Sequence, residues 1–151
     1  MKKVIVLGND HTNTLGLTQV LGREGFYVIA IVWGERRGLV KASKYCKELF
    51  SGQDPQMCIE KILRLPRESE AIPIIAACDD AALALERNME SLQERFLFEH
   101  TMGAFSIVEL LQKSLQVRLA SEASFNVPRS WITDNLSTIP NDIEYRRITT
   151  Y

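Results

Sequence analysis

The amino-acid sequence predicts an α/β fold in three layers, with a mostly parallel sheet between two layers of helices. Two observations favour this class. Short apolar runs, typical of strands buried on both faces, alternate with segments whose apolar residues have helical spacing. Glycine and acidic turns separate these segments. With 151 residues, the chain is long enough for one domain with a sizeable core.

The first part of the chain is expected to form a βαβ unit. A β-branched run stops at Gly8, and an amphipathic segment and a second apolar run follow it. Two strands joined by a helix in so few residues pair in parallel through a right-handed crossover. Thr12, Asn13 and Thr14 are the candidate caps of the helix. The predicted elements are a strand at 3–7, a helix at 14–23 and a strand at 26–32.

Later segments continue the alternation and indicate a Rossmann-like domain. Asp54 and Pro55 are expected to start one helix, and Asp79 or Asp80 is expected to cap another. Charged stretches at 64–70 and 90–99 are typical of solvated faces. The predicted elements are a short helix at 39–45, a strand at 47–50, helices at 57–65 and 81–89, a strand at 72–77, a C-terminal helix at 107–123 and an extended piece at 129–133.

The chain is therefore expected to have three parts. They are a Rossmann-like domain at 1–104, a linker helix and strand at 105–134, and an extended polar tail at 135–151.

Charge and apolar content exclude several classes of protein. Lys+Arg 18 against Asp+Glu 19, with a net charge of -1, gives no electrostatic reason to expect nucleic acid or an anionic membrane as partner. The first apolar run is too short for a secretory signal, and no stretch approaches the roughly 20 apolar residues of a membrane span. We expect a cytoplasmic protein. Cys46, Cys58 and Cys78 are odd in number and widely spaced, so they predict neither disulfides nor a metal site.

Candidate binding residues follow two of the predicted strands, because ligands of open parallel sheets lie beyond the carboxyl ends of the strands. Gly8 lets backbone approach closely, and the start of the next helix is a modest anion site. The loop matches neither G-x-G-x-x-G nor G-x-x-x-x-G-K-[ST], so a dinucleotide or triphosphate site is weakly supported. The candidates are Gly8, Asn9, Asp10, His11, Thr12, Asp79 and Asp80.

Several of these residues also have purely structural interpretations. Asp79 and Asp80 favour a helix cap with a solvated neighbour over ligand contact. His11 is as well explained as a surface turn residue. Gly16, Gly22 and Gly25 are expected to permit close packing or to end a helix.

Three passages together resemble the amino-terminal region of ATP-grasp carboxylate–amine ligases of the carbamoyl-phosphate-synthase and D-aspartate-ligase type. The first runs from Val4-Ile5-Val6-Leu7-Gly8 through Leu15-Gly16-Leu17 to Leu21-Gly22-Arg23-Glu24-Gly25. The second is Ile74-Ile75-Ala76-Ala77-Cys78-Asp79-Asp80, followed by Asn88-Met89-Glu90-Ser91-Leu92. The third is Leu110-Leu111-Gln112-Lys113, then Leu119-Ala120, then Asn126-Val127-Pro128-Arg129-Ser130.

The resemblance implies a pre-ATP-grasp domain that contributes contacts to a small carboxylate or amine substrate and packs against an ATP-binding domain. ATP and Mg²⁺ are the cofactors of the full-length family, and Lys113 is a candidate on the side of the ATP-binding domain. The sequence departs from the pattern at Gln112 and Ser124. It departs most where the family has P-x-[IVL]-x-K-P, since Arg146-Arg147-Ile148-Thr149-Thr150-Tyr151 follows there and the chain ends.

We therefore expect this chain to bind no cofactor or metal, to supply no catalytic residue and to have no ligase activity alone. The alternative is a stand-alone Rossmann-like module that binds a nucleotide or small acid at the two candidate loops. The helix at 107–123 would normally pack on the ATP-binding domain, so we also expect self-association through it.

Overall fold

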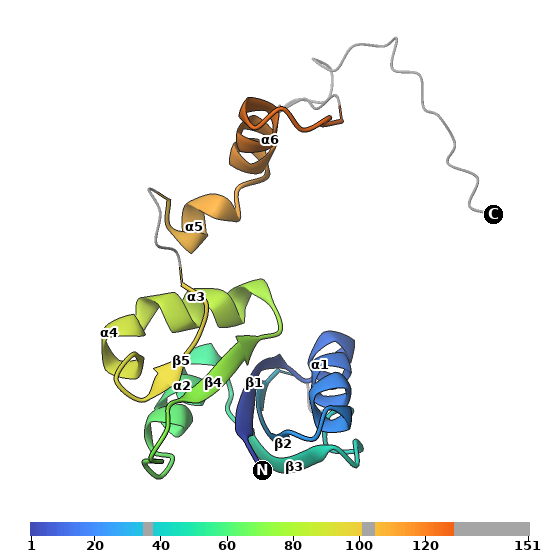
Figure 1. Ribbon diagram of the computed structural model, residues 1–151, viewed down its shortest axis with the longest axis vertical. Helices are drawn as coiled ribbons and strands as arrows, with labels where there is room; N and C mark the ends of the chain where they lie inside the picture. Colours follow the sequence, from blue (N-terminus) through green and yellow to red (C-terminus); the bar gives the residue numbers. More distant parts are fainter. Residues whose placement is uncertain (35–37, 101–104, 129–151) are drawn as a thin grey trace, which may run out of the picture. The chain divides into compact units, whose positions relative to one another are not determined.

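The computed structural model describes residues 1–34, 38–100 and 105–128. It confirms the predicted α/β class, with a Rossmann-like three-layer arrangement (Figure 1). Within these residues five parallel strands lie in the order β3-β2-β1-β4-β5, flanked by helices. The strands are β1 (Lys3–Asn9), β2 (Tyr27–Trp33), β3 (Cys46–Ser51), β4 (Ile72–Ala76) and β5 (Phe96–Leu97).

Helices follow β1, β3 and β4, whereas the described residues between β2 and β3 form no helix. The helices are α1 (Thr12–Arg23), α2 (Pro55–Leu63), α3 (Asp79–Arg87), α4 (Met89–Leu92), α5 (Ile107–Leu110) and α6 (Lys113–Glu122). The chain divides into two compact units, Met1–Glu109 and Leu110–Tyr151. All five strands belong to the first unit.

The two faces of β1 pack against different helices, which explains its unbroken apolar run. Ile5 and Leu7 belong to a cluster with Ile59 and Ile62 of α2 and with Leu85 of α3. The alternate residues Val4 and Val6 pack with Leu17 and Leu21 of α1. Figure 1 shows α1 on one side of β1, with α2 and α3 on the other. Side chains that alternate between two buried faces leave no polar position in the strand.

The predicted cap of α1 is wrong. His11 occupies the N-cap position in an extended conformation, and no side-chain hydrogen bond caps the helix. The helix begins at Thr12, two residues before the predicted start. Thr14 is buried instead, and its hydroxyl donates to the Asn9 carbonyl at 2.6 Å.

The predicted cap of α3 is also wrong, whereas that of α2 is confirmed. Cys78 is the N-cap residue of α3, so Asp79 and Asp80 lie in the first turn, where their charges favour the helix dipole. At α2 the Met57 amide donates to the Asp54 carboxylate at 2.8 Å, and Pro55 opens the helix.

Two predicted helices differ from the structure. Residues 39–45 form turns, with Ala42 donating to the Gly38 carbonyl and Ser43 to the Val40 carbonyl. The predicted helix at 107–123 is interrupted between α5 and α6, because Gln112 has an extended backbone with φ -71° and ψ 116°.

The charged stretch at 90–99 is not simply a solvated face. Leu92 of α4 and Phe96 of β5 are buried in the same cluster as Ile5. Charged residues separate these two apolar side chains, which hid their inward positions from the hydrophobic pattern. The predicted piece at 129–133 and the tail at 135–151, which includes Arg146–Tyr151, lie outside the described residues.

Candidate functional site

The carboxyl ends of β1 and β4 lie side by side at the point where the strand order reverses. β1 pairs with β2 on one edge and with β4 on the other. The Ala77 amide donates to the Leu7 carbonyl at 2.8 Å, which joins the starts of the two loops. In open α/β sheets, ligands bind at this kind of position. The structure therefore brings together the bases of the two candidate loops.

The space above Gly8 is filled by the protein itself. A Cβ at Gly8 would lie 2.6 Å from the Thr14 hydroxyl oxygen and 2.7 Å from the Ala77 Cβ. The missing side chain thus allows α1 and β4 to pack closely against the end of β1. This close approach serves internal packing, in contrast to a glycine that admits a ligand phosphate.

Asp10 joins two segments of the first unit through hydrogen bonds. Its residue is 9% exposed, and its two carboxylate oxygens accept hydrogen bonds from the Gly38 amide at 2.6 Å and the Val40 amide at 3.0 Å. Its own amide donates to the Trp33 carbonyl at 3.1 Å. Asp10 thereby links the end of β1 to the turn that precedes β3. The partners lie 28 and 30 residues away, so no local sequence signal could have identified them.

The other polar residues of the first loop remain at the surface. Asn9, His11 and Thr12 are exposed. The Thr12 hydroxyl and the His11 Nδ1 lie 3.0 Å apart. These side chains lie at the carboxyl end of β1 and are accessible to solvent.

The acidic residues of the two loops face different cavities. Asp80 lines a cavity of about 200 Å³ together with Asp54 at the start of α2 and Arg87 at the end of α3. Asp10 lines a separate cavity of about 320 Å³. Asp79 is exposed in the first turn of α3. The structure therefore joins the loops at their bases but not the carboxylates that the sequence analysis grouped.

The cavity beside Asp10 lies over the carboxyl ends of β2 and β3. Its lining residues combine apolar and polar side chains and include Val32, Trp33, Lys41, Leu49 and Ser51. Lys41 was not among the predicted candidates, because residues 39–45 were expected to form a helix. Ser51 directly follows the predicted strand at 47–50, so its place on this edge could have been inferred from the strand direction.

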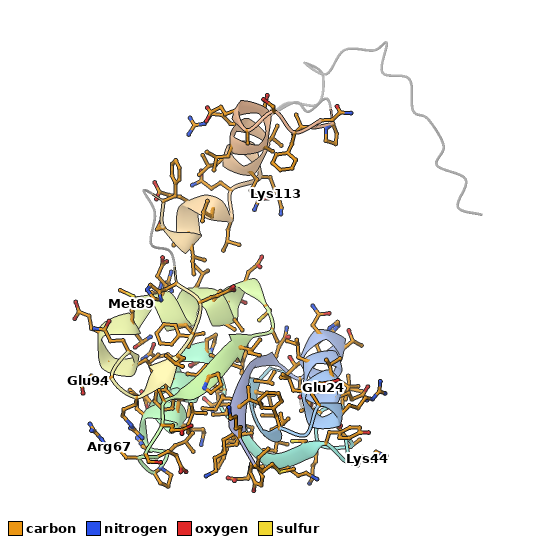
Figure 2. All side chains as sticks on the ribbon, viewed as in Figure 1. Glu24, Lys44, Arg67, Met89, Glu94 and Lys113 are labelled. Atoms are coloured by element: carbon orange, nitrogen blue, oxygen red, sulfur yellow. The ribbon has the colours of Figure 1, made fainter. Side chains whose placement is uncertain are left out.

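Lys113 belongs to the second unit and is its one candidate residue. It is the first residue of α6, and its side chain is exposed (Figure 2). The Lys113 ammonium group donates to the Gln116 side-chain oxygen at 3.1 Å.

The described residues include no group of three or more His, Cys, Asp or Glu residues that could hold a metal ion. Cys46, Cys58 and Cys78 are free thiols. Burial raises the pKa of the Cys46 and Cys58 thiols, so both are protonated near neutral pH and are poor nucleophiles. Among the described helices, none has the length and apolar character needed to cross a membrane.

Comparisons with known proteins leave the family open. No protein-family model matches the chain, and no curated protein matches it in sequence. Among solved structures, a xanthine dehydrogenase from Bacillus halodurans is similar with a TM-score of 0.41 and 15% identity, over 82% of this chain and 46% of that chain. The chain thus spans about half the length of that protein. At this TM-score and identity the similarity supports no conclusion about fold or function.

Proposed function

We propose that this chain is the amino-terminal, substrate-side domain of an ATP-grasp carboxylate–amine ligase. The observation that carries the proposal is the position of the unit boundary. The second unit begins at Leu110. Leu110 is also the first residue of the Leu110-Leu111-Gln112-Lys113 passage, which resembles the segment that leads into the ATP-binding domain in the family. The Rossmann-like sheet of the first unit is consistent with a pre-ATP-grasp domain.

The proposed division of labour follows from the chemistry of the reaction. Phosphoryl transfer to a carboxylate requires cations and Mg²⁺ around the triphosphate. The family's ATP-binding domain supplies those groups. The present chain would hold the carboxylate or amine substrate at the carboxyl edge of its sheet and supply no group that reacts. Lys113 would lie on the side of the ATP-binding domain.

Calorimetric titration of the purified chain with Mg²⁺-ATP and with ADP tests this proposal. We expect no nucleotide binding and no ATP-dependent turnover, because the proposal assigns both to the ATP-binding domain. Saturable nucleotide binding at micromolar concentrations would reject it in favour of the second candidate below. ATP hydrolysis coupled to ligation by this chain would reject it as well.

The second candidate function is a stand-alone module that binds a nucleotide or small acid. The observation that favours it is the 320 Å³ cavity at the carboxyl edge, within the first unit and lined by a candidate residue, Asp10. Such a module would bind its ligand without an ATP-binding domain. Nucleotide binding in the same titration would favour the module, because the substrate-side domain is not expected to bind nucleotide.

A cytoplasmic location belongs to the same proposal. It is supported by the three free cysteines, because the cytosol keeps thiols reduced. Fractionation of the native host cells tests it, and recovery of the chain outside the cytoplasm would contradict it.

A further inference from the structure

The cavity beside Asp10 holds a pair of opposite charges. Asp10 contributes a carboxylate and Lys41 contributes an ammonium group, and both line the same 320 Å³ space. Within the part of the chain that the structure describes, Lys41 has no ion-pair partner, and Asp10 is bonded only to backbone amides. The Asp10 carboxylate would repel a ligand that carries only a negative charge. The Lys41 ammonium group would repel a ligand that carries only a positive charge. A ligand with both charges is matched at both ends.

We propose that this cavity binds an α-amino acid with an apolar side chain. The Lys41 ammonium group would pair with the ligand carboxylate, and the Asp10 carboxylate would accept from the ligand ammonium group. Charge-assisted hydrogen bonds of this kind are about twice as strong as neutral ones.

Asp10 is suited to accept hydrogen bonds from the ligand ammonium group, because its carboxylate is already held in place without the ligand. A carboxylate offers about four lone-pair sites, and the amides of Gly38 and Val40 occupy two of them. The remaining sites can accept further donors without loss of these bonds. Because the carboxylate is held by two backbone amides, binding costs little side-chain entropy there.

The walls of the cavity indicate what kind of side chain the amino acid carries. Val32, Trp33 and Leu49 provide apolar surface, and Trp33 is only 9% exposed. The volume of about 320 Å³ is near the lower end of the range for ligand pockets, roughly 300–1,000 Å³. That size suits an amino acid such as phenylalanine or leucine and is small for a dinucleotide.

This inference deepens the second candidate function, which uses the same cavity, by naming the class of ligand and adding Lys41. It does not depend on the ligase resemblance. Binding of an amino acid is compatible with either candidate function. Its failure would leave the nucleotide titration unaffected, so the two proposals fail separately.

The first experiment follows the fluorescence of Trp33. The sequence has two tryptophans, so Trp131→Phe leaves Trp33 as the sole reporter. L-Phenylalanine is titrated into this variant, alongside 3-phenylpropionate, which lacks the ammonium group, and phenethylamine, which lacks the carboxylate. We expect saturable binding of phenylalanine. Each analogue should bind at least about tenfold more weakly, since each loses one charge-assisted contact.

The second experiment compares two lysine variants. Lys41→Gln removes the proposed carboxylate partner and should weaken phenylalanine binding at least about tenfold. Lys44→Gln is the matched control, because Lys44 is exposed on the neighbouring turn (Figure 2). It does not line the cavity. Both side chains are exposed, so both variants should fold, and circular dichroism verifies this.

Three results would overturn the proposal. The first is no saturable response to phenylalanine or leucine. The second is equal affinity for 3-phenylpropionate and phenylalanine, which would indicate a simple anion site. The third is equal loss of affinity in the two lysine variants, which would indicate a diffuse charge effect.

Discussion

Gly8 has no space for a side chain, and this makes it a sensitive position. In Gly8→Ala the new methyl group would be 2.6 Å from the Thr14 hydroxyl oxygen and 2.7 Å from the Ala77 Cβ. Such overpacking typically costs about 1–3 kcal/mol. We therefore expect the free energy of unfolding to fall by that amount. Urea denaturation measures it, and the dependence of the free energy on urea concentration (the m-value) should be unchanged.

Gly16 is the matched control, since it is also a glycine of the βαβ unit. No atom lies within 4 Å of a Cβ built there, so the expectation that it permits close packing is not supported. Gly16→Ala in the interior of α1 should raise stability by about 0.5–1 kcal/mol. A Gly8→Ala variant as stable as the parent would contradict the prediction, because it would show that Thr14 and Ala77 can move aside without loss of stability.

Residues whose partners are close in sequence were the ones that sequence reasoning could place. Asp54 and Pro55 are adjacent to the helix that they start, and their prediction is confirmed. Asp10 was recognised as a candidate, but its bonds to Gly38 and Val40 depend on the strands being in register. Lys41 reaches the cavity only through the fold of that turn. Long-range polar contacts therefore limited the prediction of the site.

At the scale of elements, α5 begins with a capping box that the sequence analysis overlooked. The Ser106 amide donates to the Glu109 carboxylate at 2.8 Å, and the Glu109 amide donates to the Ser106 hydroxyl at 3.3 Å. The spacing S-x-x-E is the local signature of this motif, so Ser106 and Glu109 were visible in the sequence.

Acid should loosen this capping box. The hydrogen bonds from the Ser106 amide and then its hydroxyl hold the pKa of Glu109 below its ordinary value of 4.5. A depressed folded-state pKa contributes stability above 4.5, and that stability is lost as pH falls through the folded value. We expect the Ser106 amide resonance to move toward its unfolded position over that acidic range in NMR spectra, and not between pH 5 and neutral.

Glu109→Gln is the control for that titration. It keeps an acceptor for the Ser106 amide but removes the ionisable group. Its Ser106 resonance should not move with acid. A pH-dependent shift that persists in Glu109→Gln would assign the effect to another carboxylate.

The exposed apolar side chains of α5 and of the segment after α6 lead to a separate prediction. None of the residues of α5 or α6 is buried, and Val108 and Phe125 are 48% and 70% exposed. Exposed apolar side chains favour association. We expect mass measured by light scattering to rise with protein concentration, and Val108→Ser combined with Phe125→Ser to reduce the rise. A parent chain that stays monomeric at high concentration would refute this.

Strands were easier to predict than the segments between them. The runs that form β1 and β2 are apolar at every buried position, because both faces of the sheet are covered. Residues 39–45 have apolar positions compatible with a helix, yet Val40 is held in a turn by its bond to Asp10. Tertiary contacts can override a local pattern in this way, and no local pattern reveals that they will.

At the scale of the whole molecule, the buried apolar core of residues 1–34, 38–100 and 105–128 belongs to the first unit. Its described buried apolar residues run from Val4 to Phe96. We expect a chain of residues 1–109 to fold alone and to unfold at the same urea concentration as the full chain. Calorimetry and urea denaturation of both chains measure this. A clearly lower midpoint for the shorter chain would show that residues 110–151 stabilise the core.

The Asp10 link also has a kinetic consequence. Its hydrogen bonds join residues 28 and 30 positions apart, so we expect them to form after β1 and β2 have paired. Contacts that form late in folding are absent from the transition state, so their loss mainly accelerates unfolding. Stopped-flow measurements on Asp10→Asn should therefore show a nearly unchanged refolding rate and a faster unfolding rate. The residue that shapes the wall of the cavity would then also govern how long each molecule stays folded.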